Sequence, residues 1–73
     1  MKIQYDKITD TMYIPMKKGV YSHSKKVTDE IIVDVSKADK VLEIEILDAS
    51  KTISGFQPQR ITVTPLARPV SYT

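Results

Sequence analysis

The 73-residue sequence contains no cysteine, which excludes disulfide bonds, thiolate metal sites and thiol chemistry. It has only two glycines, Gly19 and Gly55, and therefore no glycine-rich phosphate-binding loop. Its single histidine, His23, stands in a polar stretch that shows neither a nucleophile nor an orienting partner, which favours a surface histidine. With no catalytic constellation visible, we expect a protein that is not an enzyme and uses no cofactor.

The sequence also lacks a large excess of charge of either sign, and it lacks long apolar runs. Eleven Lys and Arg residues against nine Asp and Glu give a net charge of +2, too little to attract nucleic acid or an anionic membrane strongly. The longest apolar runs, such as residues 31–33, are far shorter than the roughly 20 residues that span a bilayer. The first residues, MKIQYDK, lack the pattern of a signal peptide. We expect a cytoplasmic protein without membrane contact.

The most regular pattern lies between residues 41 and 50. Leu42, Ile44 and Ile46 alternate with Glu43 and Glu45, which is the period of a strand with one buried and one wet face. The two glutamates would keep the solvent-facing side of the strand soluble, or they would complement a basic surface on a partner protein.

A short helix is predicted directly after this strand. Asp48 stands where a helix would begin, with its carboxylate as the N-terminal cap, and Gly55 stands where the helix would end. The candidate, residues 49–54, is less than two turns long and would not form alone. It can cover only a corner of a sheet.

Four earlier segments also favour strands, namely residues 2–5, 12–16, 20–27 and 31–35, each separated from the next by a few turn residues. Gly19 is predicted to take a positive φ at the end of a hairpin loop. The pattern predicts a mostly β fold (α+β by strict count): an antiparallel β-meander with one short helix after the central strand.

The chain divides into two parts. Residues 1–56 are expected to form the β-meander domain with its helix. Residues 57–73 hold three of the four prolines and are expected to be an extended segment, packed on the domain or on a partner. The β-branched residues 61–64 within it predict a possible extra strand.

The predicted sheet has an apolar face larger than the helix can cover. A sheet face of this kind has to pack against another layer. We therefore predict a homodimer, or a complex with a small protein partner. The predicted face consists of Met12, Ile14, Met16, Ile31, Val33, Val35, Leu42, Ile44 and Ile46.

Aspartates cluster near the predicted turns. Asp6 and Asp10 flank the first turn, and Asp34 and Asp48 end strands. Grouped carboxylates can bind a divalent cation or act as an acid–base pair, which keeps a metal-dependent enzyme as a third alternative. The favoured interpretation is that each carboxylate bonds nearby backbone N–H groups, and we expect no bound metal.

Four lysines form the basis of a second alternative. A hairpin around residues 17–19 would bring them onto one rim together with an aromatic side chain, which could contact a nucleic-acid backbone weakly. The competing interpretation is that the lysines protect an exposed edge strand. The residues of this predicted rim are Lys17, Lys18, Tyr21, Lys25 and Lys26.

Three blocks in this order resemble one known family. They are KIQYDKITDTMYI at residues 2–14, DE before IIVD at residues 29–34, and VLEIEILDASK at residues 41–51. Over residues 1–53 the chain is similar to the short prokaryotic proteins called domain of unknown function 2283, although Glu43 stands where that family usually has glycine. The resemblance implies a compact β-meander with a short helix. It also suggests an antitoxin role beside small toxin-like proteins, without assigning any active-site residue.

The sequence thus predicts a small non-enzymatic interaction module, either antitoxin-like or a regulatory partner of another small protein. Weak nucleic-acid binding through the lysine rim is the alternative, and a metal-dependent enzyme is the third possibility.

Overall fold

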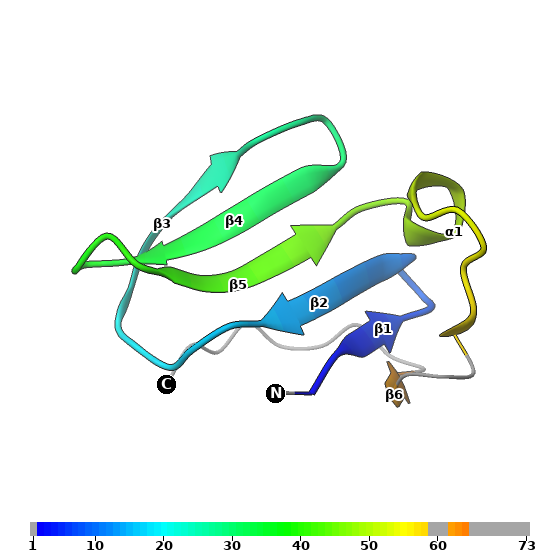
Figure 1. Ribbon diagram of the computed structural model, residues 1–73, viewed down its shortest axis with the longest axis horizontal. Coiled ribbons are helices and arrows are strands. Elements are labelled where there is room, and N and C mark those ends of the chain that lie inside the picture. Colours follow the sequence, from blue (N-terminus) through cyan, green and yellow to red (C-terminus); the bar gives the residue numbers. More distant parts are fainter. Residues whose placement is uncertain (1, 59–61, 65–73) are drawn as a thin grey trace.

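The computed structural model describes residues 2–58 and 62–64, which form one mixed sheet and one short helix (Figure 1). The sheet has the strand order β3-β4-β5-β2-β1-β6, in which the first five strands pair antiparallel and β6 pairs parallel to β1. The elements are β1 (Gln4–Asp6), β2 (Thr11–Pro15), β3 (Tyr21–Lys26), β4 (Ile31–Ser36), β5 (Val41–Ile46), α1 (Ala49–Thr52) and β6 (Thr62–Thr64).

The mostly β class is confirmed, but the simple meander is wrong. Strands β3, β4 and β5 follow one another as a meander, whereas β2 pairs with β5 instead of β3. This pairing sets Met12 opposite Ile46 and Ile14 opposite Ile44. Such aliphatic pairs stabilise a sheet, and the polar sequence of β3 offers none of them to β2. The helix follows β5, one of the two middle strands of a six-stranded sheet that has no single central strand.

Residues 16–20 are therefore a crossover between distant strands, not a hairpin. The loop passes the ends of β5 and β4 to reach β3 at the sheet edge (Figure 1). Gly19 does not have the predicted positive φ. It is needed for close approach, because a Cβ atom there would lie 2.8 Å from Leu42 Cδ2.

Left-handed backbone occurs at turn residues of another type. Asp10, Asp39 and Asp48 have φ values of 53°, 61° and 48°. Aspartate tolerates this conformation better than most residues because its short side chain can bond locally. Gly55, three residues beyond α1, has a φ of 66°, close to where the sequence predicts the end of the helix.

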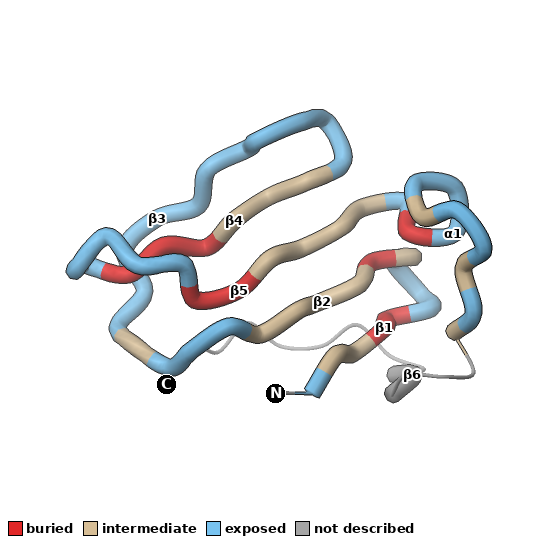
Figure 2. Tube along the Cα trace, in the orientation of Figure 1, coloured by how far each residue is buried: buried red, intermediate tan, exposed pale blue. Residues whose placement is uncertain are grey.

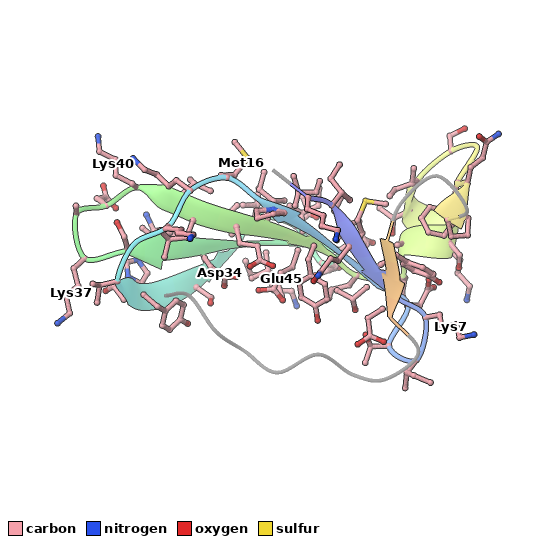
Figure 3. All side chains as sticks on the ribbon, turned by 90° about the horizontal axis from the view of Figure 1, so that it is seen from below. Lys7, Met16, Asp34, Lys37, Lys40 and Glu45 are labelled. Carbon is pink, nitrogen blue, oxygen red and sulfur yellow. The ribbon has the colours of Figure 1, made fainter. Side chains whose placement is uncertain are left out.

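The sheet has one apolar and one polar face. In the edge-on view of Figure 3, Met16 points to one side of the sheet, while Asp34 and Glu45 point to the other. Helix α1 lies at one end of the sheet, where Ala49 is fully buried. Next to it the Phe56 ring packs edge-on against Tyr5, with 4.7 Å between ring centroids. The helix covers a corner of the sheet, as its length predicts.

Two predictions concern segments beyond this core. Strand β6 lies within the predicted extra strand at residues 61–64, although Ile61 is outside the described residues. The remainder of the predicted C-terminal segment, residues 65–73, is also outside them. Among the residues that the structure describes, no helix has the length and apolar character needed to cross a membrane.

Candidate functional site

The apolar face is the largest candidate surface. Cross-strand registers place its aliphatic residues side by side, with Ile44 between Ile14 and Val33, and Ile46 between Met12 and Ile31. The structure therefore assembles the predicted face. The single chain leaves most of this face uncovered, as predicted for a face larger than the helix can cover.

Only Val35 and Leu42 of the nine predicted residues are buried, and Met16 is 50% exposed. Figure 2 shows most of β2, the first half of β4 and the second half of β5 at intermediate burial. The physical reason is that the described residues form a single layer, and α1 reaches only one corner. A sheet without a second layer leaves its apolar side chains half in water.

Asp6 has the local structural role that was favoured for it. Its Oδ1 accepts hydrogen bonds from the backbone N–H groups of Ile8, at 2.9 Å, and Thr9, at 3.3 Å. The residue is 1% exposed. The carboxylate thus organises the turn between β1 and β2.

Asp10 joins that turn to the helix. Its Oδ1 accepts hydrogen bonds from the Tyr5 hydroxyl at 2.6 Å and the Ser50 backbone N–H at 3.1 Å. Its Oδ2 accepts one from the Ser50 hydroxyl at 2.7 Å, and its backbone oxygen accepts the N–H of Ala49. The predicted cap, Asp48, is left-handed and forms no side-chain cap bond. The helix is instead capped by a residue about forty positions earlier in the chain.

The same contacts shift the titration of both partners. Burial acts to raise the pKa of Asp10, but the hydrogen bonds from Tyr5 and Ser50, with the charge of Lys51, bring it below its ordinary value. The hydrogen bond to Asp10 raises the pKa of Tyr5 to about 12, helped by burial and by the charges of Asp10 and Asp6.

Two buried acids on the polar face form a pair that the sequence analysis does not predict. Asp34 on β4 lies opposite Glu43 on β5, and they are 0% and 5% exposed. Asp34 Oδ1 accepts a hydrogen bond of 2.6 Å from Ser24, whose Oγ lies 2.7 Å from the Tyr21 hydroxyl. Among the residues that the structure describes, Asp34 Oδ2 is buried and has no hydrogen-bond partner. Acidic residues inside two adjacent strands are the signal that would have revealed the pair.

This burial corrects the predicted role of the glutamates. Glu43 does not project into solvent, so it cannot present its charge to a partner in this structure. Glu45 is partly buried, opposite Tyr13 on β2. Within residues 2–58 and 62–64, no group of three or more His, Cys, Asp or Glu residues is arranged to hold a metal ion.

The single lysine rim is not formed. Lys25 and Lys26 lie on β3, where they pair with Asp39 at 4.0 Å and Asp29 at 3.8 Å. The tyrosine of the predicted rim, Tyr21, lies on the same strand and is 38% exposed.

The other two lysines, Lys17 and Lys18, lie in the crossover loop. They border a pocket of about 280 Å³ together with Lys37 and Lys40 of the β4–β5 turn. The crossover thus separates the predicted rim into two groups.

Comparison with known proteins gives one family. The family model described as "Protein of unknown function (DUF2283)" matches residues 2–50, from just before β1 into α1. This match confirms the resemblance predicted from the sequence blocks. No curated protein and no solved structure matches the chain.

Proposed function

The chain belongs to the DUF2283 family, and we propose that it is a non-enzymatic interaction module whose apolar sheet face packs against a second copy of the chain. The observation that supports this is the half-buried aliphatic face of β2, β4 and β5. A chain of this size without disulfides has few other means of stabilising a core, and oligomerisation is one of them.

The size of the face fits a modest dimer interface. Three strands at about 4.8 Å spacing, each about 20 Å long, cover about 290 Å² in projection. Protruding side chains add accessible surface to this projection, which places the face at or below the roughly 600 Å² per partner of the smallest specific interfaces. We therefore expect a dimer that dissociates at low concentration.

The composition of the face favours a second copy as its occupant. Its centre carries Ile14, Ile44 and Val33, with no charge between them. A two-fold axis would bring two identical aliphatic patches together, as in a sandwich of two sheets. If another small protein, and not a second copy, packs on this face, the chain would have an antitoxin-like or regulatory role.

Sedimentation velocity of the wild type and two variants tests the dimer. Ile44→Glu puts a charge at the centre of the face and should give a folded monomer. Ile8→Glu makes the same change at a turn residue that is 63% exposed and should leave the dimer intact. A wild type that stays monomeric at about 100 μM and melts cooperatively would overturn the proposal.

A pull-down of the tagged protein from nuclease-treated native cells separates the two kinds of occupant. A wild-type dimer in sedimentation, with only the bait recovered, supports self-association. One small protein recovered at equal stoichiometry, with the Ile44→Glu bait unable to recover it, would replace the second copy by a regulatory partner.

The alternatives have less structural support. Nucleic-acid binding through the predicted rim would rest on a hairpin that the fold does not contain, and two of its lysines are in ion pairs on β3. A metal-dependent enzyme built on Asp6 and Asp10 would have to break the hydrogen bonds that organise the first turn and the helix.

A further inference from the structure

The crossover loop and the turn that joins β4 to β5 lie at the end of the sheet farthest from α1 (Figure 1). Residues of these two segments line a pocket. Its volume of about 280 Å³ is close to the lower limit of the roughly 300–1,000 Å³ found for ligand pockets. Val20, Ala38 and Leu42 contribute apolar carbon to its lining. This surface is separate from the centre of the apolar face.

Four lysines, Lys17, Lys18, Lys37 and Lys40, border this pocket, and we call it the lysine pocket. In the described part of the chain, none of the four takes part in an ion pair. The only acid in the two lining segments is Asp39, and its carboxylate lies 4.0 Å from Lys25 Nζ on β3. The local charge is thus strongly positive although the net charge of the chain is only +2.

The lining indicates the chemistry of the ligand. The lysine ammonium groups can pair with a carboxylate or a phosphate, and the apolar carbon between them favours a ligand that also carries an apolar group. None of the described lining residues is an aromatic that could stack on a base. Val20 is 58% exposed at the pocket, available to an incoming apolar group. The combination fits a ligand that has an apolar group between carboxylates.

The directions of the lysines indicate the size of the ligand. Figure 3 shows Lys40 pointing to the side of the sheet that carries Met16, and Lys37 pointing to the side that carries Asp34. A ligand that meets both charges has to extend beyond the pocket itself. An extended polypeptide segment does this, whereas a small carboxylate fills only the pocket.

We propose that the lysine pocket binds an acidic segment of a partner protein, with an apolar side chain of that segment seated against Val20 and Leu42. Complementary charge then supplies specificity and fast association, and the apolar contact holds the segment in place. Leu42 also belongs to the apolar face, but the pocket lies at the end of that face and away from its centre at Ile44, so binding is expected whether the chain is monomeric or dimeric.

Fluorescence anisotropy tests the proposal with a labelled peptide that has one Leu flanked by Glu residues. The double variant Lys37→Glu/Lys40→Glu should bind it at least about tenfold more weakly than the wild type. The control Lys7→Glu/Lys51→Glu makes the same charge change at the other end of the sheet and should stay within about twofold. Circular dichroism confirms that both variants are folded.

Further arms separate charge from apolar contact. A peptide with Gln in place of Glu should lose binding, and Val20→Ser should weaken binding of the Glu peptide a few-fold, by about the loss of one partly buried apolar side chain. No binding at about 1 mM peptide, or equal weakening by the two double variants, would overturn the proposal. So would a single-stranded oligonucleotide that binds through Lys37 and Lys40 while the peptide does not.

Discussion

Replacing Asp10 with alanine should destabilise the protein more than any other change at a single turn residue. The Asp10 carboxylate accepts hydrogen bonds from Tyr5 on β1 and from both the backbone and the hydroxyl of Ser50 on α1. It therefore joins the first strand to the helix. The alanine variant loses all three bonds together.

The magnitude follows from the type and burial of these bonds. A hydrogen bond to a charged group contributes about 1.5–3 kcal/mol when buried, and loss of a helix cap costs about 1 kcal/mol. Because Asp10 is half-buried, we take the lower end of each range and expect the lost bonds alone to lower the free energy of unfolding by about 2–3 kcal/mol, before the backbone strain of alanine at this position is added. For a domain of this size that lowers the Tm by about 10–20 °C.

Alanine also pays for the left-handed backbone at this position, so the control has to share that cost. Asp39 has a φ of 61°, similar to the 53° of Asp10, and its carboxylate has one long ion pair with Lys25 at the surface. Asp39→Ala should therefore lose only about 1 kcal/mol, mostly from backbone strain. Asp10→Asn keeps one oxygen acceptor and tolerates positive φ, so it should fall between the two alanine variants.

Urea denaturation followed by circular dichroism at neutral pH measures all three variants. If Asp10→Ala were no less stable than Asp39→Ala, the hydrogen bonds of Asp10 would contribute nothing and the reasoning would fail. The pH dependence gives a second check. Since the pKa of Asp10 is lowered on folding, its contribution is present above the ordinary value of 3.8 and is lost as the pH falls through the folded value. The alanine variant should lack this loss.

Three further predictions rest on single contacts. Tyr5 should titrate near pH 12 when tyrosinate absorbance is followed, and titration near pH 10 would contradict this. Because its pKa is raised on folding, the stability that Tyr5 contributes should be complete below pH 10 and should fall as the pH rises toward 12. The Tyr5→Phe variant should not show this loss of stability. Gly19→Ala should lower the free energy of unfolding in urea by about 1 kcal/mol, the low end for overpacking, because the new methyl group meets only the end of the flexible Leu42 side chain, at 2.8 Å; an unchanged midpoint would show that loop and side chain adjust freely. Asp34→Asn should leave the free energy of unfolding in the same assay unchanged or raise it, because it removes a buried charge and sets an N–H donor beside Glu43. A large loss of stability would mean that other groups fully stabilise the buried Asp34 charge.

Local patterns predicted the strands well because alternation of apolar and polar residues is a property of the segment itself. The span of β5 follows from the alternation of residues 41–46, and the polar edge strand β3 follows from its lysines. Pro15 is tolerated inside the sheet because it lies at the end of β2, beyond Tyr13, the last residue paired with β1, where its missing N–H costs no ladder bond on that side.

Strand pairing was not predictable in the same way. A prediction from local patterns assumes that strands adjacent in the sequence pair in the sheet, and this assumption fails for β2 and β3. The consequence for the candidate sites is direct. Because residues 16–20 cross the end of the sheet, Lys17 and Lys18 border the lysine pocket with Lys37 and Lys40. They do not form the predicted hairpin rim with Lys25 and Lys26.

The sequence by itself determined the β class, the family, the position of the short helix and the membership of the apolar face, because each depends on residue types at short spacing. Only the tertiary structure decided that β5 lies between β2 and β4, that Asp10 caps the helix in place of Asp48, and that Glu43 is buried opposite Asp34. These outcomes depend on which distant segments meet. That is decided by the summed cross-strand pairs and hydrogen bonds of the whole sheet, and no local window of the sequence contains that sum.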